Sequence, residues 1–176
     1  MTRIGSVKED ISLEKRISIT LETVKKFNAL GFSINLEKNY GEHLGIHDEV
    51  YKKNGANINT SKEEVFEKSD IILKVNGPSV AELDLIKSKS ILIAQFDPNL
   101  YQDSINRFIK KDIKIFSLNL LPRITRAQSM DVLSSQANLS GYKAVIESFS
   151  KFEQAIPMMM TAAGTVPAAK ILVIGA

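Results

Sequence analysis

The sequence predicts an α/β fold: a parallel, Rossmann-like or flavodoxin-like sheet with helices on both faces. Three observations predict it. Short β-branched runs alternate with helical patterns along the chain, which is the order of βαβ units. The middle runs are nearly continuous in Ile, Leu and Val, as in strands that helices cover on both sides. Gly31 and Gly55 each follow a helical pattern, where glycine suits the left-handed end of a helix.

The expected elements follow from these patterns. Strands are expected where β-branched residues cluster, over residues 3–7, 33–37, 71–75, 91–95, 113–118 and 171–174. Helices are expected between them, over residues 21–30, 48–54, 62–68, 80–86 and 100–110. Asp48 is expected to be the N-cap of the second helix. Glu63 and Glu64 fall in the first turn of the third, where acidic side chains favour the helix dipole.

Residues 132–156 form the longest helical pattern. Small and apolar residues recur on one stripe of it: Leu133, Ala137, Ser140, Ala144, Ser148 and Phe152. Gly164 and Pro167 then break the chain before the run ILVIGA, which is typical of the first strand of a second domain. The expected organisation is an N-terminal α/β domain (1–130), a linking helix (131–156) and the start of a truncated second Rossmann domain (157–176).

Composition excludes several classes of function. A chain of 176 residues, 44% of them hydrophobic, can bury one core, or one domain and a fragment of another. The net charge is +3, but the lysine pairs are scattered, so no nucleic-acid interface is predicted. The sequence has no cysteine, which excludes disulfides and thiolate metal sites and suits a reducing cytoplasm. His43 and His47 have metal-ligand spacing, but Gly41 and Gly45 interrupt the helix that would carry them, so no metal site is predicted.

No membrane span is predicted either. The N-terminus lacks an apolar signal region. The most apolar stretch, residues 155–169, contains two prolines and a glycine and falls short of the ~20 apolar residues that a spanning helix needs.

The segment 121–146 contains the largest group of side chains that could bind a ligand. It joins an arginine fork, an amide and a carboxylate to a helix start, an arrangement that suits a polar planar ligand such as a carboxamide. The same composition also suits a plain capped helix, with Ser129 or Asp131 as N-cap and the arginines in solvent. The polar side chains concerned are Arg123, Arg126, Gln128 and Asp131, followed at helical spacing by Ser134, Ser135, Asn138 and Tyr142.

This segment, PRITRAQSMDVLSSQANLSGYKAVI, resembles the nucleotide-contacting loop in the NAD(H)-binding alpha subunits of proton-translocating NAD(P) transhydrogenases. The wider family includes alanine dehydrogenase. The segments RIGSVKED, EKRISIT, DIILKVNGP and TAAGTVPAAKILVIGA resemble their family counterparts in order and spacing, so the resemblance extends over the whole chain.

Two positions separate the branches of the family. Alanine dehydrogenases carry a substrate-binding lysine where this chain has Asn76, and a catalytic histidine where it has Asp97. Amino-acid oxidation would therefore lack its substrate anchor and its proton acceptor. Asn76 is usual in the transhydrogenase branch. Arg16 occurs in both branches, and Leu21 stands where the family usually has proline.

The resemblance implies NAD(H) as cofactor, and it makes Arg123, Gln128 and Asp131 the candidate catalytic residues. Arg123 and Asp131 would hold the carboxamide and nearby ribose or phosphate groups, while Gln128 would face NADP(H) bound by a partner domain. Further cofactor contacts would come from the side chains of Ser134 and Tyr142 and from the backbone of Ile124, Thr125, Ser129 and Met130. Gly175 would open a phosphate-binding G-x-G-x-x-G turn, of which only this first glycine is present.

The implied reaction is hydride transfer between two nicotinamides, which requires positioning rather than an acid–base pair. The implied partners are a second NAD(H)-binding part in a homodimer, an NADP(H)-binding beta subunit and a membrane proton channel. The protein would lie in the cytoplasm, peripheral to the inner membrane. Residues 1–176 alone are expected to bind NAD(H) weakly and to be inactive. The alternatives are an amino-acid oxidoreductase of the alanine dehydrogenase type and a non-catalytic truncated remnant.

Overall fold

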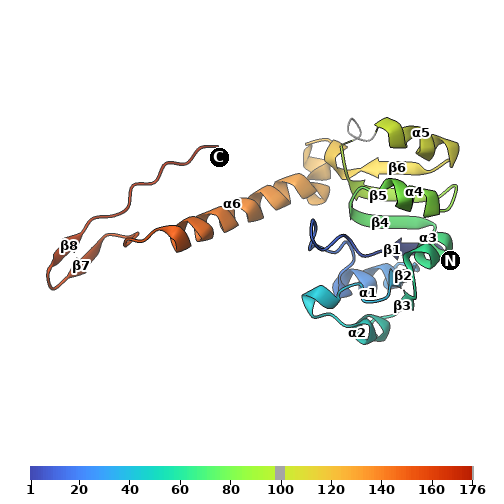
Figure 1. Cartoon of the computed structure of the whole chain (residues 1–176), viewed down its shortest axis with the longest axis horizontal. Helices are drawn as coiled ribbons and strands as arrows, with labels where there is room; N and C mark the ends of the chain where they lie inside the picture. Colours follow the sequence, from blue (N-terminus) through green and yellow to red (C-terminus); the bar gives the residue numbers. More distant parts are fainter. Residues whose placement is uncertain (98–101, 176) are drawn as a thin grey trace. The chain divides into compact units, whose positions relative to one another are not determined.

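The computed structural model describes residues 1–97 and 102–175 (Figure 1). Contacts between Cα atoms divide the chain into two compact units, Met1–Met130 and Asp131–Ala176. We call them the N-terminal unit and the C-terminal unit. The first two residues of the helix expected over 100–110 lie outside the described residues.

The N-terminal unit contains a six-stranded sheet with the order β3-β2-β1-β4-β5-β6, and every neighbouring pair is parallel. In chain order, β1, β2 and β3 run from the centre of the sheet to one edge, and β4, β5 and β6 then run from the centre to the other edge. The reversal of direction lies between β1 and β4. The strands are β1 (Arg3–Ser6), β2 (Ser33–Glu37), β3 (Ala56–Asn59), β4 (Ile71–Asn76), β5 (Ile91–Gln95) and β6 (Lys114–Ser117).

Two apolar cores lie against the sheet, because successive side chains of a strand point to opposite faces. One core joins Ile4 and Ile34 to Val24 of α1 and Tyr51 of α2. The other joins strand residues to α3, α4 and α5, for example Leu92 to Phe66. Helices therefore cover both faces, as predicted. They are α1 (Leu21–Ala29), α2 (Asp48–Lys53), α3 (Lys62–Lys68), α4 (Val80–Leu85) and α5 (Gln102–Lys110).

Gly5 lies where α3 approaches β1 most closely. A Cβ atom at this position would lie 2.2 Å from Ser69 Oγ and 2.9 Å from Val65 Cγ1. Ser69 and Val65 are both fully buried. Only glycine lets the helix pack at this distance from the centre of the sheet.

The helix ends largely follow the sequence. Gly31 and Gly55 adopt φ values of 86° and 92°, each directly after a C-cap residue, which confirms the predicted left-handed ends. Glu63 and Glu64 lie in the first turn of α3. The N-cap of α2 is His47 rather than Asp48, so that prediction was wrong by one residue. Asp48 instead accepts a hydrogen bond from the Asn39 N–H at 2.9 Å.

The C-terminal unit comprises α6 (Val132–Lys151) and an antiparallel hairpin of β7 (Met159–Thr161) and β8 (Gly164–Val166). No side chain of α6 is buried, so its small and apolar stripe is exposed. A helix and a two-stranded hairpin provide too few layers to enclose a core. The helix ends at Lys151, five residues before the expected end.

The strand expected over 171–174 is not formed. These residues have no strand assignment, and their side chains are 67–89% exposed. A β-strand exists only through hydrogen bonds to a neighbour, and no described segment pairs with this run. Among the described residues, no helix combines the length and the apolar character that crossing a membrane requires.

Candidate functional site

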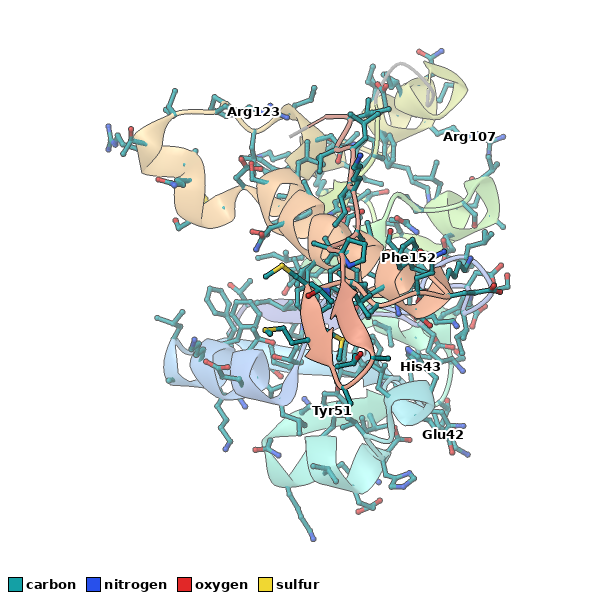
Figure 2. All side chains as sticks on the ribbon, turned by 90° about the vertical axis from the view of Figure 1, so that its left-hand side faces the viewer. Glu42, His43, Tyr51, Arg107, Arg123 and Phe152 are labelled. Carbon is teal, nitrogen blue, oxygen red and sulfur yellow. The ribbon has the colours of Figure 1, made fainter. Side chains whose placement is uncertain are left out.

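The residues 121–130 follow β6, and we call them the nucleotide loop because the sequence predicts that they contact a nucleotide. They include the 3₁₀ helix η4 (Thr125–Met130). The loop closes on itself: the Ile124 N–H donates to the Pro122 carbonyl and the Ala127 N–H to the Ile124 carbonyl, both at 2.9 Å. Arg123 (Figure 2), Arg126 and Gln128 are exposed. The loop therefore presents a guanidinium fork and an amide to solvent, where both can meet a ligand.

Asp131 begins α6 as its N-cap. Its Oδ1 accepts the Ser134 N–H at 3.0 Å, and its Oδ2 accepts the Ser134 hydroxyl at 2.5 Å. The structure thus brings together two of the predicted site residues, and it bears out the capping interpretation of Asp131. A carboxylate oxygen can accept more than one hydrogen bond, so the capping role is compatible with a hydrogen bond from a ligand to a carboxylate that α6 holds in a fixed orientation.

The predicted Ile124, Thr125, Ser129 and Met130 lie in the nucleotide loop, whereas Tyr142 and Gly175 belong to the C-terminal unit. Tyr142 is 69% exposed on α6. Gly175 adopts φ 78°, a left-handed conformation suited to the start of a tight glycine turn. Gly175 and Gly141, the neighbour of Tyr142 in the chain, line the same mainly apolar groove of about 710 Å³ between α6 and the segment 169–175.

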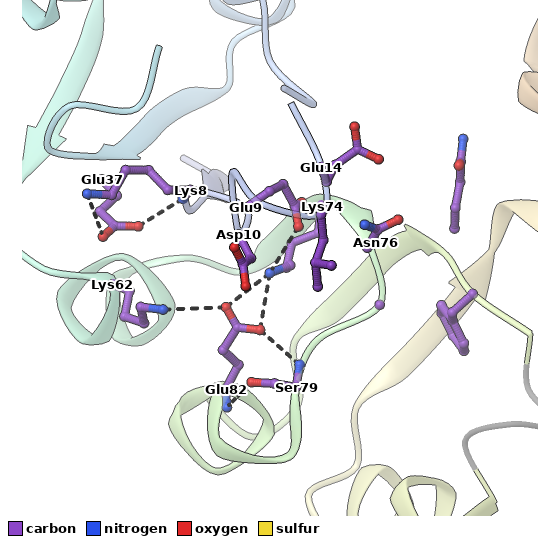
Figure 3. Close-up of a pocket in the computed structure, with 14 residues that line it drawn as sticks. Lys8, Glu9, Asp10, Glu14, Glu37, Lys62, Lys74, Asn76, Ser79 and Glu82 are labelled. Carbon is purple, nitrogen blue, oxygen red and sulfur yellow. Dashed lines mark hydrogen bonds and ion pairs between the residues drawn. The ribbon is translucent and has the colours of Figure 1, made fainter. Parts of the chain in front are cut away.

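A second site lies at the carboxyl edge of the sheet in the N-terminal unit (Figure 3). It is a cavity of about 850 Å³. Its walls come from the ends of β1, β2, β4 and β5, around the point where the strand order reverses, which is where open α/β sheets hold ligands. The lining includes Lys8, Glu9, Asp10, Leu13, Glu14, Glu37, Lys62, Lys74, Asn76, Gly77, Ser79, Glu82, Gln95 and Phe96.

A buried ion cluster forms the floor of this cavity. The Lys74 side chain is 4% exposed, and its Nζ lies 3.0 Å from Glu82 Oε1 and 3.5 Å from Glu9 Oε2. Glu9 also accepts the Val75 N–H at 2.7 Å. Burial raises the pKa of Glu9, against the opposite effect of Lys74. Burial also acts to raise the pKa of Glu82, but the Lys74 charge and the Ser79 N–H together hold it below the ordinary value. The charge of Lys74 is therefore already paired with two carboxylates of the chain itself.

Arg16 is also paired with a carboxylate of the chain. Its guanidinium donates to both carboxylate oxygens of Glu14, at 2.8 and 2.6 Å. Glu14 lines the cavity, and its side chain is only 11% exposed. A bidentate arginine–carboxylate pair is among the stronger ion pairs in proteins. The fork of Arg16 is therefore occupied by a carboxylate of the chain itself.

The charge of the lining limits what the cavity can hold. Three lysines and five carboxylates line it, which gives the lining a formal charge of −2, or −1 when the Arg16 guanidinium paired with Glu14 is counted. Asn76, which also lines it, carries no charge. A small organic anion would meet a negative field here. Sequence reasoning identified Asn76 but missed the cavity, although its side chains stand at the carboxyl ends of predicted strands.

His43 has a structural partner. Its Nε2 donates to the Lys15 carbonyl oxygen at 2.8 Å, since a carbonyl can only accept. Within residues 1–97 and 102–175, no group of three or more His, Asp or Glu side chains is arranged to hold a metal ion.

The chain matches the model of a known protein family over residues 5–140, described as alanine dehydrogenase/PNT, N-terminal domain. It is 40% identical over 177 residues to the first part of the NAD(P) transhydrogenase subunit alpha of Rickettsia prowazekii (strain Madrid E), covering 98% of this chain and 46% of that relative. The corresponding protein of Rhodospirillum rubrum is 39% identical over 178 residues, with the same coverage. The alanine dehydrogenase of Methanococcus maripaludis is 37% identical over only 89 residues, 51% of this chain and 24% of that protein.

Solved structures agree on the fold. The crystal structure of a transhydrogenase from Sinorhizobium meliloti superposes with a TM-score of 0.86 at 44% identity, covering 95% of this chain and 50% of that one. An L-alanine dehydrogenase gives a TM-score of 0.62 at 20% identity, over 66% of this chain and 32% of that one, which is a likeness of fold alone. The chain spans about half the length of the transhydrogenase proteins from Rickettsia and Rhodospirillum. The chain therefore belongs to the alanine dehydrogenase/PNT family, and within it to the side of the NAD(P) transhydrogenase alpha subunits, which it resembles along nearly its whole length.

Proposed function

We propose that this chain is the N-terminal part of the NAD(H)-binding alpha subunit of an NAD(P) transhydrogenase, and that the nucleotide loop contacts the nicotinamide end of NAD(H). The observation that carries the proposal is the exposed pair Arg123 and Gln128, on a loop fixed by its own backbone hydrogen bonds. A guanidinium fork and an amide suit a carboxamide and a phosphate. The donor set therefore fits the cofactor that the relatives' names imply.

The proposed roles follow the chemistry of each group. Arg123 donates to the carboxamide or to a nearby phosphate. Asp131, held by Ser134, accepts from the carboxamide or from a ribose hydroxyl. Gln128 points at a second nucleotide on a partner domain. Ser134 and Tyr142 support the ring and ribose, Gly175 the phosphates, and the backbone of Ile124, Thr125, Ser129 and Met130 completes the contacts of the loop.

Bound NADH and NADP⁺ supply the chemistry, which is the movement of a hydride between two nicotinamide rings. The role of the protein is to orient the rings and exclude water, so no side chain has to take up a proton. We further propose a homodimer of NAD(H)-binding parts, an NADP(H)-binding beta subunit, and coupling to proton movement through a membrane component at the cytoplasmic side of the inner membrane. Amino-acid oxidation is disfavoured, because the cavity that contains Asn76 has a negative lining.

The test separates binding from transfer. In the complete subunit assembled with its partners, Arg123→Ala should weaken NADH binding about tenfold or more, the loss expected for a charged hydrogen bond. Gln128→Asn should instead lower the rate of hydride transfer and leave NADH affinity nearly unchanged, because it shortens a group that faces the other nucleotide. NADH affinity is measured by fluorescence titration and transfer by single-turnover absorbance.

Arg126→Ala is the matched control, since Arg126 is an equally exposed arginine of the same loop with no proposed contact. Its NADH affinity should stay within about twofold of the unsubstituted protein, as for an ordinary surface substitution. Equal losses of affinity in Arg123→Ala and Arg126→Ala would reduce the role of Arg123 to general charge. Equal losses of affinity and rate in Gln128→Asn would contradict its place between the nucleotides.

A further inference from the structure

Ala127 is the one fully buried side chain of the nucleotide loop, with 4% of its surface exposed. Leu121 is half-buried, and the other residues of the loop are exposed. Arg123 and Gln128, to which the proposed function assigns NAD(H) and NADP(H), thus stand on a segment in which Ala127 is the one buried side chain.

The geometry of η4 links Ala127 to Gln128. A 3₁₀ helix has three residues per turn, so side chains three positions apart lie on one edge. Met130 lies on the same edge of η4 as Ala127, and Ile124, whose carbonyl accepts the Ala127 N–H, stands just before the helix; their side chains are 54% and 55% exposed. Gln128 follows Ala127 directly and lies about a third of a turn away. With Ala127 turned inward, Gln128 is directed outward.

The position of Ala127 affects the position of Gln128 through the backbone that joins them. The Ala127 N–H donates to the Ile124 carbonyl at 2.9 Å, which closes the turn around the buried methyl group. Consecutive Cα atoms are about 3.8 Å apart across a trans peptide, so a displacement of residue 127 also moves residue 128. A side chain larger than alanine cannot enter a site with so little exposed surface without moving the backbone.

We propose that Ala127 is a positioning residue for hydride transfer: its buried methyl group seats the nucleotide loop so that the Gln128 amide meets the second nucleotide. This inference rests on the proposed function and deepens it, because it explains how an exposed loop can hold one side chain in a fixed direction. Arg123 precedes η4 and is not part of the turn that Ala127 seats.

The test uses the complete subunit assembled with its partners and compares Ala127→Leu, Ala127→Ser, Gln128→Asn and the double variant Ala127→Leu/Gln128→Asn. Ala127→Leu should slow hydride transfer at least about tenfold, because small misplacements of a positioning group have large effects on rate. NADH affinity should fall by a smaller factor than the rate does, because Arg123 and Asp131 lie outside η4 and the backbone of the loop supplies only part of the proposed NADH contacts. Ala127→Ser, of nearly equal volume, should keep most of the rate.

The double variant identifies the route of the effect. If Ala127 acts through Gln128, the double variant is no slower than the slower single variant, whereas independent effects multiply. Arg126→Leu is the control for a larger apolar side chain beside Ala127, and it should leave the rate unchanged because residue 126 is exposed. If Ala127→Leu unfolds, Ala127→Val and Ala127→Gly provide the same comparison with smaller changes.

Failure of the proposed role of Gln128 and failure of the role of Ala127 give different experimental results. If Gln128→Asn alone leaves transfer unchanged, the proposed role of Gln128 is refuted, and the inference falls with it. If Gln128→Asn slows transfer but Ala127→Leu does not, or if the two losses multiply, only the inference is overturned. A fall in the unfolding midpoint of Ala127→Leu with full transfer activity overturns it too, since it would assign Ala127 a role in stability alone.

Discussion

Gly5 illustrates how one residue fixes the distance between two layers. The nearest atoms to a Cβ at this position belong to Ser69 and Val65, at 2.2–2.9 Å. The Ser69 hydroxyl also accepts a hydrogen bond from the Asn35 amide at 3.5 Å. Neither neighbour is the free end of a long side chain, so neither can move aside without disturbing a buried contact.

Gly5→Ala should therefore destabilise the protein by about 1–3 kcal/mol, the usual effect of overpacking a core. The free energy of unfolding from urea titration measures it. Gly141→Ala is the matched control, because a Cβ there meets nothing within 4 Å and the residue lies inside α6. That variant should be neutral or stabilising by up to about 1 kcal/mol. Equal effects of the two substitutions would refute the close contact at Gly5.

Single residues were predicted from the sequence with mixed success, and Asp131 shows why. Capping and ligand binding were alternative interpretations of its position, yet the structure gives the cap without excluding the ligand. A helix N-cap is a local property that the sequence specifies well. The burial of Ala127 is different, because a single alanine between Arg126 and Gln128 forms no pattern that predicts a buried position.

At the scale of elements, local pattern predicted most of the N-terminal unit. The runs 33–37 and 91–95 and the helix 62–68 have the predicted bounds. The strand β3 was missed because Asn57 and Asn59 alternate with its two apolar residues, a composition uncommon in strands. The strand over 171–174 was predicted but is absent, because an apolar run gives the propensity for a strand and not the neighbour that the strand needs.

One ion-pair group ties several elements together at the amino end of the sheet. Asp70, just before β4, accepts the Arg3 N–H of β1 at 3.0 Å and pairs with Lys87, which follows α4, at 2.8 Å. The hydrogen bond from Lys87 is the main cause that lowers the Asp70 pKa from 3.8 to about 2, with smaller contributions from Arg3.

The free energy of unfolding should therefore depend on pH in acid, through the protonation of Asp70. The folded pKa is below the unfolded value, so the stabilisation is complete above pH 4 and is lost as the pH falls toward about 2. Asp70→Asn should lower the free energy of unfolding at neutral pH and flatten its slope between pH 4 and pH 2. Lys87→Met should flatten the slope partly. An unchanged slope in Asp70→Asn, measured by urea titration at a series of pH values, would contradict the assignment.

At the scale of the whole molecule, the alternation of elements was sufficient to predict the parallel sheet but not the cavity at its edge. The cavity combines side chains from positions 8 to 96, and only the strand order brings them together. That order places β1 beside β4. No local pattern encodes this neighbourhood, so Lys74 and its carboxylates looked like ordinary charges in the sequence.

The proposed phosphate contacts lead to a prediction about binding. A polypeptide of residues 1–176 should bind NADH about a hundredfold or more weakly than one extended through the second half of the subunit, since it lacks two or more charged hydrogen bonds of about 1.5–3 kcal/mol each. Fluorescence titration of both polypeptides measures the difference. Equal affinities would show that the nucleotide loop and α6 hold NADH without the glycine turn that Gly175 would open.

The acidic lining of the cavity also limits what a single substitution at Asn76 could change. A mutation of Asn76 to lysine would change the formal charge of the lining from −2 to −1, and Arg16 would remain paired with Glu14. This single substitution would therefore leave the lining without a net positive charge to attract a substrate anion. We therefore expect Asn76→Lys alone to show no oxidation of alanine by the assembled protein.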